Sequence, residues 1–385
     1  MILSNLKAVG IDEIVDLRID GDKIAAISST PILNQDHAMQ LTFENALVFP
    51  GLINSHDHLD FNLFPQLGTR IYNNYTEWGR DIHRTYKKEI AEVLKVPDFL
   101  RAEWGVYKNL LCGVTTVVNH GKRLNMFDAP ITVFGDTHCL HSIKFEKLWR
   151  IKLNNPFKTK VPVNIHIGEG SDWPSFFEIS QLAQWNLLRK RLIGVHAVAM
   201  SEEQAKKFEA IVWCPQSNYF LLNKTARVDL LKNNTKLLFG TDSTLTSEWD
   251  MWEHLRSARE AKLIADDELY QTVNQNAAKT WQLNNGEIAV GKDADIVVAK
   301  IKDHKKGFDA YFAITPADLL LVMHKGNIGL FDETIMGQLK TIRVSEYSKI
   351  YINGVGKYVR GDLPGLMEKI KVYYPAARFP VNANN

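Results

Sequence analysis

The sequence predicts an α/β fold, a (β/α)8 barrel joined to a small β-sandwich that both chain ends build. Short apolar strands alternate with helices from residue 46 to residue 281, polar residues directly follow the strands, and β-rich segments lie at both ends. About eight strands fit in that span, which is the number a closed barrel needs. A doubly wound sheet is the alternative, but it would not bring residues from the first and last strands together.

The predicted division is 1–49 for the first part of the sandwich, 50–285 for a metal-dependent barrel and 286–385 for the second part of the sandwich. The first segment holds a hairpin signal, Asp20-Gly21-Asp22, between two apolar runs. It is too short to fold alone. We therefore expect it to pair with the β segments near the other end, beginning at 296–299.

Composition excludes several classes of function. The 385 residues are 45% hydrophobic and 23% charged, and the net charge of +2 gives no reason to expect nucleic acid or an anionic membrane as a partner. The three cysteines are far apart, which argues against a disulfide framework. We expect no secretory signal, because residues 1–7 become polar too soon, and the sequence holds no apolar run of about 18 residues. We expect a cytoplasmic protein with a small-molecule substrate, and homo-oligomer formation stays open.

The chain is organised around two histidines that follow an apolar strand. Residues 46–53 are apolar, and His56 and His58 come directly after them. Alternate residues of a strand point to the same face, so both imidazoles can reach one point in space. Two imidazoles that converge on one point can bind a metal ion there. The alternative for an isolated His-x-His is a solvated turn residue beside a packed core residue.

The segment that follows these histidines, 58–97, is polar and aromatic. We predict a long loop that runs into a helix over 81–94. The loop is either a lid over a substrate or a surface excursion with its own small cluster. The remaining elements predicted in this half are a helix at 98–111, strands at 114–118, 131–134 and 139–143, and a helix at 145–153.

In the second half, successive strands end in polar residues. The strand 161–166 ends in His166, the strand 192–196 ends in His196, and a later strand from 236 runs to Asp242. The other predicted elements are a strand at 210–213 and helices at 176–185, 202–209, 228–232, 250–264 and 266–281. Barrel enzymes place their chemistry at such strand ends.

Together these strand-end residues predict a divalent metal site. Several imidazoles and a carboxylate suit Zn²⁺ best, with Fe²⁺ or Mn²⁺ as alternatives. Such a metal lowers the pKa of a bound water towards neutrality, so a hydrolase is expected. The contributing residues are His56, His58, His166, His196 and Asp242.

The chain resembles the amidohydrolase superfamily over essentially its whole length. It looks most like the branch of cytosine, guanine, S-adenosylhomocysteine and triazine deaminases and chlorohydrolases. The motifs that carry the resemblance are Pro50-Gly51-Leu52-Ile53, His56-Asp57-His58, Gly113-Val114-Thr115-Thr116, His166-x-x-Glu169, Val195-His196-Ala197-Val198, Cys214-Pro215-x-Ser217-Asn218, Gly240-Thr241-Asp242-Ser243 and Gly291-Lys292-Asp293-Ala294-Asp295.

The resemblance implies roles for individual residues. His196 would polarise the attacking water or the developing oxyanion, Glu169 would carry a proton to the ring and then to the leaving amine, and Asp242 would accept the proton of the water. The alternative for Glu169 is a carboxylate that caps the next helix. The implied ligands of one metal are His56, His58, His166 and Asp242.

The predicted reaction is hydrolytic deamination of an amino-substituted N-heterocycle. Lys144 keeps open a second possibility, an amide or cyclic-amide hydrolase with two metals, and a catalytically inactive binding protein is the third. His120 either lines the pocket or has a structural role. The chain lacks the arginine loop of guanine deaminases, which argues against guanine. Aromatic residues that either stack on a planar substrate or pack in the core are Tyr75, Trp78, Trp173, Tyr219 and Trp249.

Overall fold

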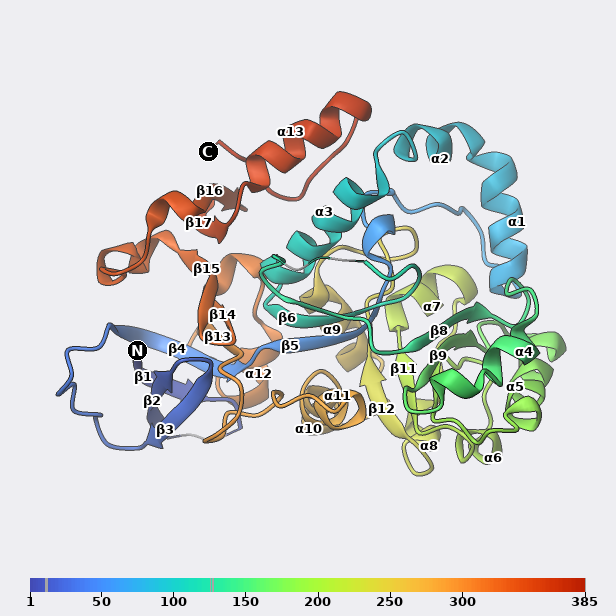
Figure 1. The fold of residues 1–385 in the computed structure, drawn as a ribbon, viewed down its shortest axis with the longest axis horizontal. Helices are drawn as coiled ribbons and strands as arrows, with labels where there is room; N and C mark the ends of the chain where they lie inside the picture. Colours follow the sequence, from blue (N-terminus) through green and yellow to red (C-terminus); the bar gives the residue numbers. More distant parts are fainter. Residues whose placement is uncertain (11–12, 125, 127, 385) are drawn as a thin grey trace.

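The computed structural model describes residues 1–10, 13–124, 126 and 128–384, and it has a mixed α/β architecture. Figure 1 places the first strands, in blue, beside the last strands, in orange and red, at one side of the molecule. The middle of the chain forms the other side. Chain segments far apart in sequence therefore build one part of the fold together.

The two chain ends form one nine-stranded sheet, in the order β16-β17-β15-β14-β13-β4-β1-β2-β3. Strand β4 (Gln40–Pro50) pairs in parallel with β1 (Ile2–Ala8) and antiparallel with β13 (Ile296–Lys300). The predicted pairing of the chain ends is confirmed. The two-layer sandwich is not confirmed. The other strands are β2 (Ile14–Asp20), β3 (Lys23–Ser28), β14 (Leu319–His324), β15 (Asn327–Asp332), β16 (Tyr347–Ile352) and β17 (Val355–Arg360).

The middle of the chain holds a three-stranded sheet, β5-β6-β7, and a five-stranded sheet, β12-β11-β10-β9-β8, with parallel pairing throughout. The two sheets meet where Thr241 N and Asp242 N each donate to His56 O at 3.1 Å. The strands are β5 (Leu52–Asp57), β6 (Val114–Asn119), β7 (Thr132–Phe134), β8 (His138–Ser142), β9 (Val163–Ile167), β10 (Leu192–His196), β11 (Ala210–Trp213) and β12 (Lys236–Phe239).

A continuous closed ladder is not detected in the described part of the chain, because no pairing joins β7 to β8. Strand β7 is short, so few of its backbone N–H and C=O groups are available to pair with β8. The apolar run 46–53 is also divided between two sheets. Its first part belongs to β4, and Gly51 N donates to Asp295 O before β5 begins.

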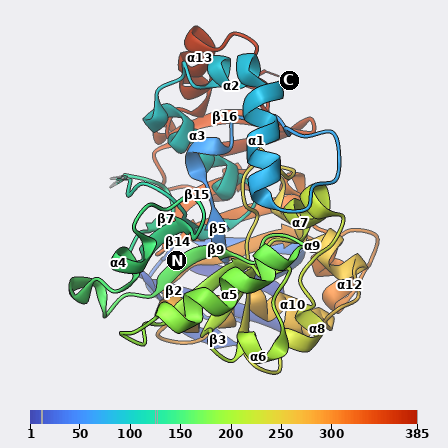
Figure 2. The same cartoon turned by 90° about the vertical axis from the view of Figure 1, so that its right-hand side faces the viewer.

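Helices cover the outside of these sheets, and both ribbon views place α1, α2, α3 and α13 at one end of the molecule (Figures 1 and 2). The helices are α1 (Tyr75–Thr85), α2 (Lys87–Val93), α3 (Asp98–Leu111), α4 (Trp149–Leu153), α5 (Trp173–Trp185), α6 (Glu202–Ala205), α7 (Pro215–Leu222), α8 (Val228–Leu231), α9 (Met251–Glu260), α10 (Asp266–Thr272), α11 (Gln275–Trp281), α12 (Gly307–Phe312) and α13 (Leu363–Tyr373). Short 3-10 segments are η1 (Leu59–Phe61), η2 (Pro156–Lys158), η3 (Pro316–Asp318), η4 (Glu333–Gln338) and η5 (Val344–Glu346).

The segment predicted as a long loop after the two histidines is largely helical, so that prediction is wrong for 75–80. Helix α1 begins at Tyr75 because the Asn74 side chain accepts hydrogen bonds from Thr76 N and Glu77 N. The helix predicted at 145–153 begins only at Trp149. The sequence analysis missed α7, α12 and α13.

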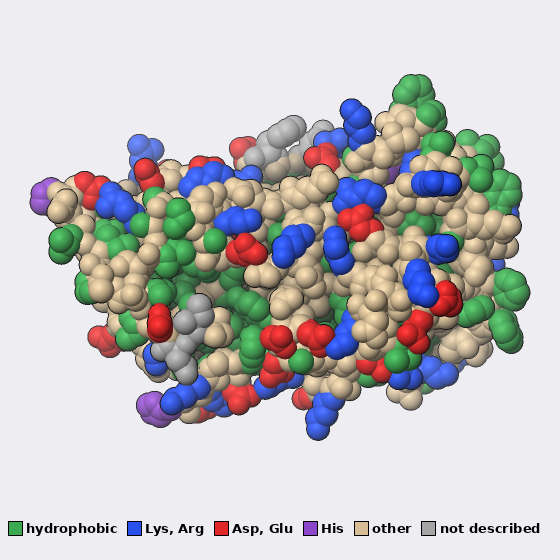
Figure 3. Space-filling view, turned by 90° about the horizontal axis from the view of Figure 1, so that it is seen from below, with side chains coloured by type: hydrophobic (Ala, Val, Ile, Leu, Met, Phe, Trp, Pro, Cys, Tyr) green, Lys and Arg blue, Asp and Glu red, His purple; other side chains and the backbone are tan. Residues whose placement is uncertain are grey.

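The surface mixes charges of both signs. On the face drawn in Figure 3, acidic and basic side chains alternate with apolar ones, as the near-balanced composition leads one to expect. None of the helices in the described residues is both long enough and apolar enough to cross a membrane.

A buried ion pair lies in the terminal sheet. Lys357 on β17 is fully buried, and its Nζ donates to Asp332 Oδ2 at 2.5 Å. The same ammonium group donates to Ala317 O at 2.8 Å and Leu319 O at 2.7 Å. A buried charge is tolerated only when its partners replace the lost water, and these three acceptors do so.

Replacing Lys357 by Met should lower the free energy of unfolding by about 3–5 kcal/mol, because Asp332 would stay buried without a counter-charge. The matched control is Lys371→Met, which breaks an exposed pair with Glu368 and should cost less than about 1 kcal/mol. Urea denaturation followed by tryptophan fluorescence measures both. Equal effects of the two substitutions would contradict the prediction, and adding Asp332→Leu to Lys357→Met should recover part of the loss.

Candidate metal centre and active site

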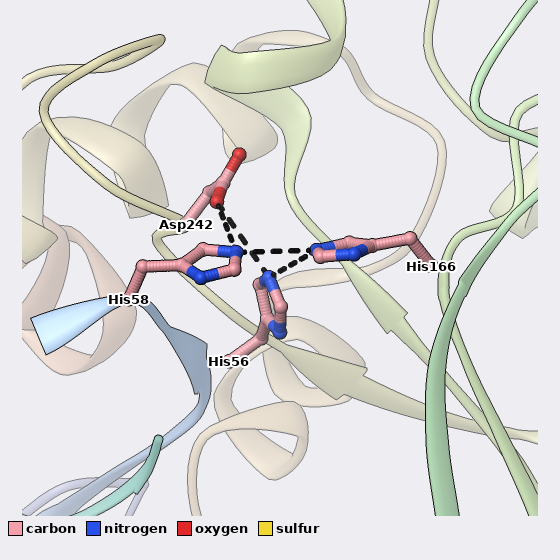
Figure 4. A group of neighbouring side chains, drawn as sticks. All are labelled: His56, His58, His166 and Asp242. Carbon is pink, nitrogen blue, oxygen red and sulfur yellow. Dashed lines mark hydrogen bonds and ion pairs between the residues drawn. The ribbon is translucent and has the colours of Figure 1, made fainter. Parts of the chain in front are cut away.

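Three histidines and one aspartate converge at the ends of the central strands (Figure 4). His166 Nε2 lies 3.1 Å from His56 Nε2 and 3.2 Å from His58 Nε2. Asp242 Oδ1 lies 3.6 Å from the Nε2 atoms of His56 and His58. One donor atom from each residue therefore faces the same small space, and all four side chains are buried.

The chemistry of this donor set fits a divalent metal. Burial and the neighbouring imidazoles lower the pKa of His58 to about 3 and that of His166 well below its ordinary value. Both rings are therefore neutral at pH 7, with lone pairs available. His166 Nδ1 donates to His141 O at 2.9 Å, which leaves Nε2 unprotonated towards the cluster. Nitrogen and carboxylate donors at such spacing are the ligands that Zn²⁺ prefers.

Asp242 is held in one orientation. Its Oδ2 accepts hydrogen bonds from Ser217 Oγ at 2.7 Å and Thr246 Oγ1 at 3.0 Å, so Oδ1 faces the histidines. Burial raises the pKa of this carboxyl, but the imidazoles of His56, His196 and His58 beside it together hold that pKa well below its usual value. The group is therefore an anion at neutral pH.

Backbone strain accompanies two of the predicted site residues. His196 has φ +71° and Asp242 has φ +58°, in the left-handed region that residues with side chains rarely adopt. The strain at Asp242 is offset where its N–H donates to His56 O across the two sheets. Such conformations cluster at functional sites because the surrounding structure must enforce them.

His196 presents an N–H group to the site. Asn218 Nδ2 donates to His196 Nδ1 at 2.9 Å, so the neutral ring carries its proton on Nε2. Thr225 Oγ1 donates to Asn218 Oδ1 at 3.4 Å, which fixes the amide in that orientation. His196 Nε2 lies 3.6 Å from Glu169 Oε2.

Glu169 is buried beside the cluster, in the loop after β9. Burial, with the charges of Asp242 and Glu178, raises the pKa of this carboxyl well above its ordinary value. The group can therefore hold a proton at neutral pH. Glu169 does not cap the following helix, because the Asp172 side chain does so by accepting from Ser175 N.

The Glu169 loop is also joined to α1. Tyr75 N, at the start of that helix, donates to Glu169 O at 3.1 Å. Ser171 N donates to Asn73 O at 2.9 Å, so the two segments are connected on both sides of the carboxyl-bearing residue. The position of Glu169 therefore depends on the position of α1.

A buried polar network supports His56 on β5 and His58 directly after it. Asp57, which lies between them, accepts from Lys108 Nζ at 3.1 Å and from Asn109 Nδ2 at 2.7 Å. Its other oxygen accepts from Asn62 Nδ2 at 2.7 Å. Lys108 Nζ also donates to Thr241 Oγ1 at 3.3 Å, which ties β5 to the segment that carries Asp242.

The sequence analysis gave no role to several of these supporting residues. Ser217 and Asn218 were recognised only as part of a motif, although their place directly after a strand was a usable signal. Lys108 lies on α3, and its helical surroundings gave no sign that its ammonium group reaches β5.

The other residues singled out from the sequence occupy different places. The His120 ring packs against that of His166, with ring centroids 4.1 Å apart. Lys144 is exposed in the turn after β8, and within the described residues it forms no hydrogen bond or ion pair with the four clustered side chains. Tyr75 and Trp78 line the cavity beside the cluster. Trp173 and Tyr219 line a neighbouring groove, and Trp249 packs against the core.

Comparisons with known proteins agree with this arrangement. Residues 160–329 match the model of the amidohydrolase family. The chain is 26% identical to a 5-methylthioadenosine/S-adenosylhomocysteine deaminase of Pyrococcus abyssi, over 62% of this chain and 55% of that enzyme. It is 21% identical to a 5'-deoxyadenosine deaminase of Methanococcus vannielii, over 74% of this chain and 83% of that enzyme.

A solved structure shares the fold. An adenosine deaminase from Xanthomonas campestris with bound zinc superposes with a TM-score of 0.72 at 15% identity, over 98% of each chain. The chain is therefore similar, over part of its length, to the amidohydrolase family. The two curated relatives are named as deaminases.

The four-residue cluster predicts the metal content of the purified protein. Elemental analysis should find about one equivalent of a divalent metal, and His166→Ala should lose most of it because one of four donors is removed. His83→Ala is the matched control, since that histidine is exposed on α1. Metal retained in full by His166→Ala would contradict the assignment, and two equivalents in the unaltered protein would favour a two-metal centre.

Proposed function

We propose that this protein is a metal-dependent hydrolase that removes the amino group from an amino-substituted N-heterocycle, releasing ammonia. The observation that carries the proposal is the placement of Glu169 and His196 beside the converged metal-binding donors. This combination offers an acid and a hydrogen-bond donor next to a Lewis-acid site. Relatives named as deaminases add support.

The proposed metal ligands are His56, His58, His166 and Asp242, holding one divalent ion. Zn²⁺ suits this donor set best, and Fe²⁺ is the alternative. When bound, the ion supplies a Lewis acid that makes a water molecule acidic enough to attack at neutral pH.

The side chains would then perform the proton transfers. Asp242 Oδ1 would accept the proton of the attacking water. Glu169, protonated in its buried surroundings, would give its proton to a ring nitrogen and later carry the water's second proton to the departing amine, which leaves as ammonia. His196 Nε2–H would hydrogen-bond to the oxygen as it adds to the ring carbon.

The finer architecture belongs to the same proposal. We infer that residues 50–285 form a (β/α)8 barrel whose ladder is interrupted between β7 and β8, with 1–49 and 286–385 forming the terminal sheet. The backbone bonds between His56 O and the segment after β12 support this inference, because they join the first strand to the last.

The two-metal amide hydrolase has less support. In that alternative Lys144 would bridge two ions, yet its side chain lies exposed in the turn after β8. Loss of catalysis has no support either, because the described site keeps both Glu169 and His196 in contact range.

Glu169→Gln tests the proposal most directly. The amide keeps the size of the side chain but cannot carry the proton, so kcat should fall about 10²–10⁴-fold while metal content stays unchanged. Asp242→Asn is the contrasting variant and should weaken both metal binding and activity. A panel of aminopurines, aminopyrimidines, aminotriazines and pterins, screened for ammonia release, supplies the substrate. Full activity of Glu169→Gln would refute the proton-carrier role, and loss of its metal would make Glu169 a ligand.

A further inference from the structure

The cavity beside the metal centre is divided into a polar end and an apolar end. Its volume is about 760 Å³, which exceeds the needs of an unsubstituted heterocycle. The acidic side chains that line it, Glu169 and Asp242, lie at the metal end. A heterocycle placed for attack there would leave the outer part of the cavity for whatever the ring carries.

The outer part is bounded by an apolar wall, which we define as Phe64, Trp78, Ile82, Ile90, Leu94 and Phe145. Four of these residues belong to α1 and α2 or follow α2 directly. Leu94 and Phe145 are each 51% exposed. Large apolar side chains left uncovered at the mouth of a cavity indicate an apolar ligand surface.

Polar groups in the outer part are poorly suited to a sugar. Arg80 and Arg84 stand at the solvent rim, where Arg80 Nε donates to Thr76 O and Arg84 pairs with Asp81. Tyr75 offers a single hydroxyl, and the imidazoles of His83 and His141 also line the cavity. A ribose lying against the wall would therefore give up hydrogen bonds to water with few replacements, and such unpaired groups weaken binding.

We propose that the substrate is an amino-substituted heterocycle that carries an apolar alkyl or aryl substituent, which lies along the apolar wall, and that unmodified nucleosides are poorer substrates. The inference rests on the proposed deamination for the identity of the reacting ring. The placement of the substituent rests on the wall alone, so the two can fail separately.

Binding of 1-alkylimidazoles to the zinc-loaded protein tests the wall without catalysis. The free ring nitrogen suits the metal end, and the alkyl chain would extend towards α1 and α2. Isothermal titration with the methyl, butyl and hexyl compounds should show affinity rising about fourfold for each methylene that becomes buried. Affinity independent of chain length would overturn the inference.

Two variants test whether the gain in affinity with chain length arises at the apolar wall. Leu94→Ser and Phe145→Ser should each reduce the affinity gained from methyl to hexyl by about fivefold or more, while binding of 1-methylimidazole stays the same. Leu187→Ser is the matched control, because Leu187 is 66% exposed and lies outside the cavity lining. An equal loss in the control would show that the alkyl chain binds elsewhere, and would overturn the inference.

A substrate pair completes the test. With 9-hexyladenine and adenosine, kcat/KM for ammonia release should favour the hexyl compound by at least tenfold, and a preference for adenosine would overturn the inference. If neither compound nor any member of the heterocycle panel released ammonia, the proposed function would fail, and chain-length-dependent binding would still support an apolar ligand. If ammonia were released but binding did not depend on alkyl chain length, the proposed deamination would be upheld. The proposal that the substituent lies along the apolar wall would then be refuted.

Discussion

The structure depends on the convergence of three imidazoles and one carboxylate in a buried space. His166 Nε2 lies 3.1–3.2 Å from two other ring nitrogens, so one nitrogen of each ring faces the same small space. Neighbouring charged and polar side chains hold this arrangement in place. Lys108 and Asp57 fix the strand that carries two histidines, while Ser217 and Thr246 fix Asp242. These buried polar side chains therefore position the same four-residue cluster.

The same requirement explains how the sheets meet. A metal centre built from the first and last central strands needs those strands to be neighbours, and His56 O accepts two backbone hydrogen bonds from the segment after β12. Gly240 makes this approach feasible, since a Cβ there would lie 2.7 Å from the Cβ of His56. The terminal sheet, by contrast, includes β4 and contributes none of the four clustered residues. Those residues come from the strands that follow β4 in the chain.

Sequence reasoning located the four clustered residues because strand ends carry a simple signal, a polar residue directly after an apolar run. It also paired the chain ends correctly. It missed a local signal at α1, where Asn74 caps the first turn. It also failed where tertiary contacts decide, because the terminal strands form one sheet in which β4 has partners from both chain ends. The role of Lys108 was invisible for the same reason, because its partners are about fifty residues and more away in sequence.

The hydrogen bond from Tyr75 N to Glu169 O has a consequence for how the cavity of this protein can diversify. Helix α1 contributes Trp78 and Ile82 to the cavity and also holds the loop that bears the acidic group. A substitution that reshapes the cavity by shifting this helix would also shift Glu169, the proposed proton carrier. Selection for new substrates would then act on affinity and on the placement of Glu169 together.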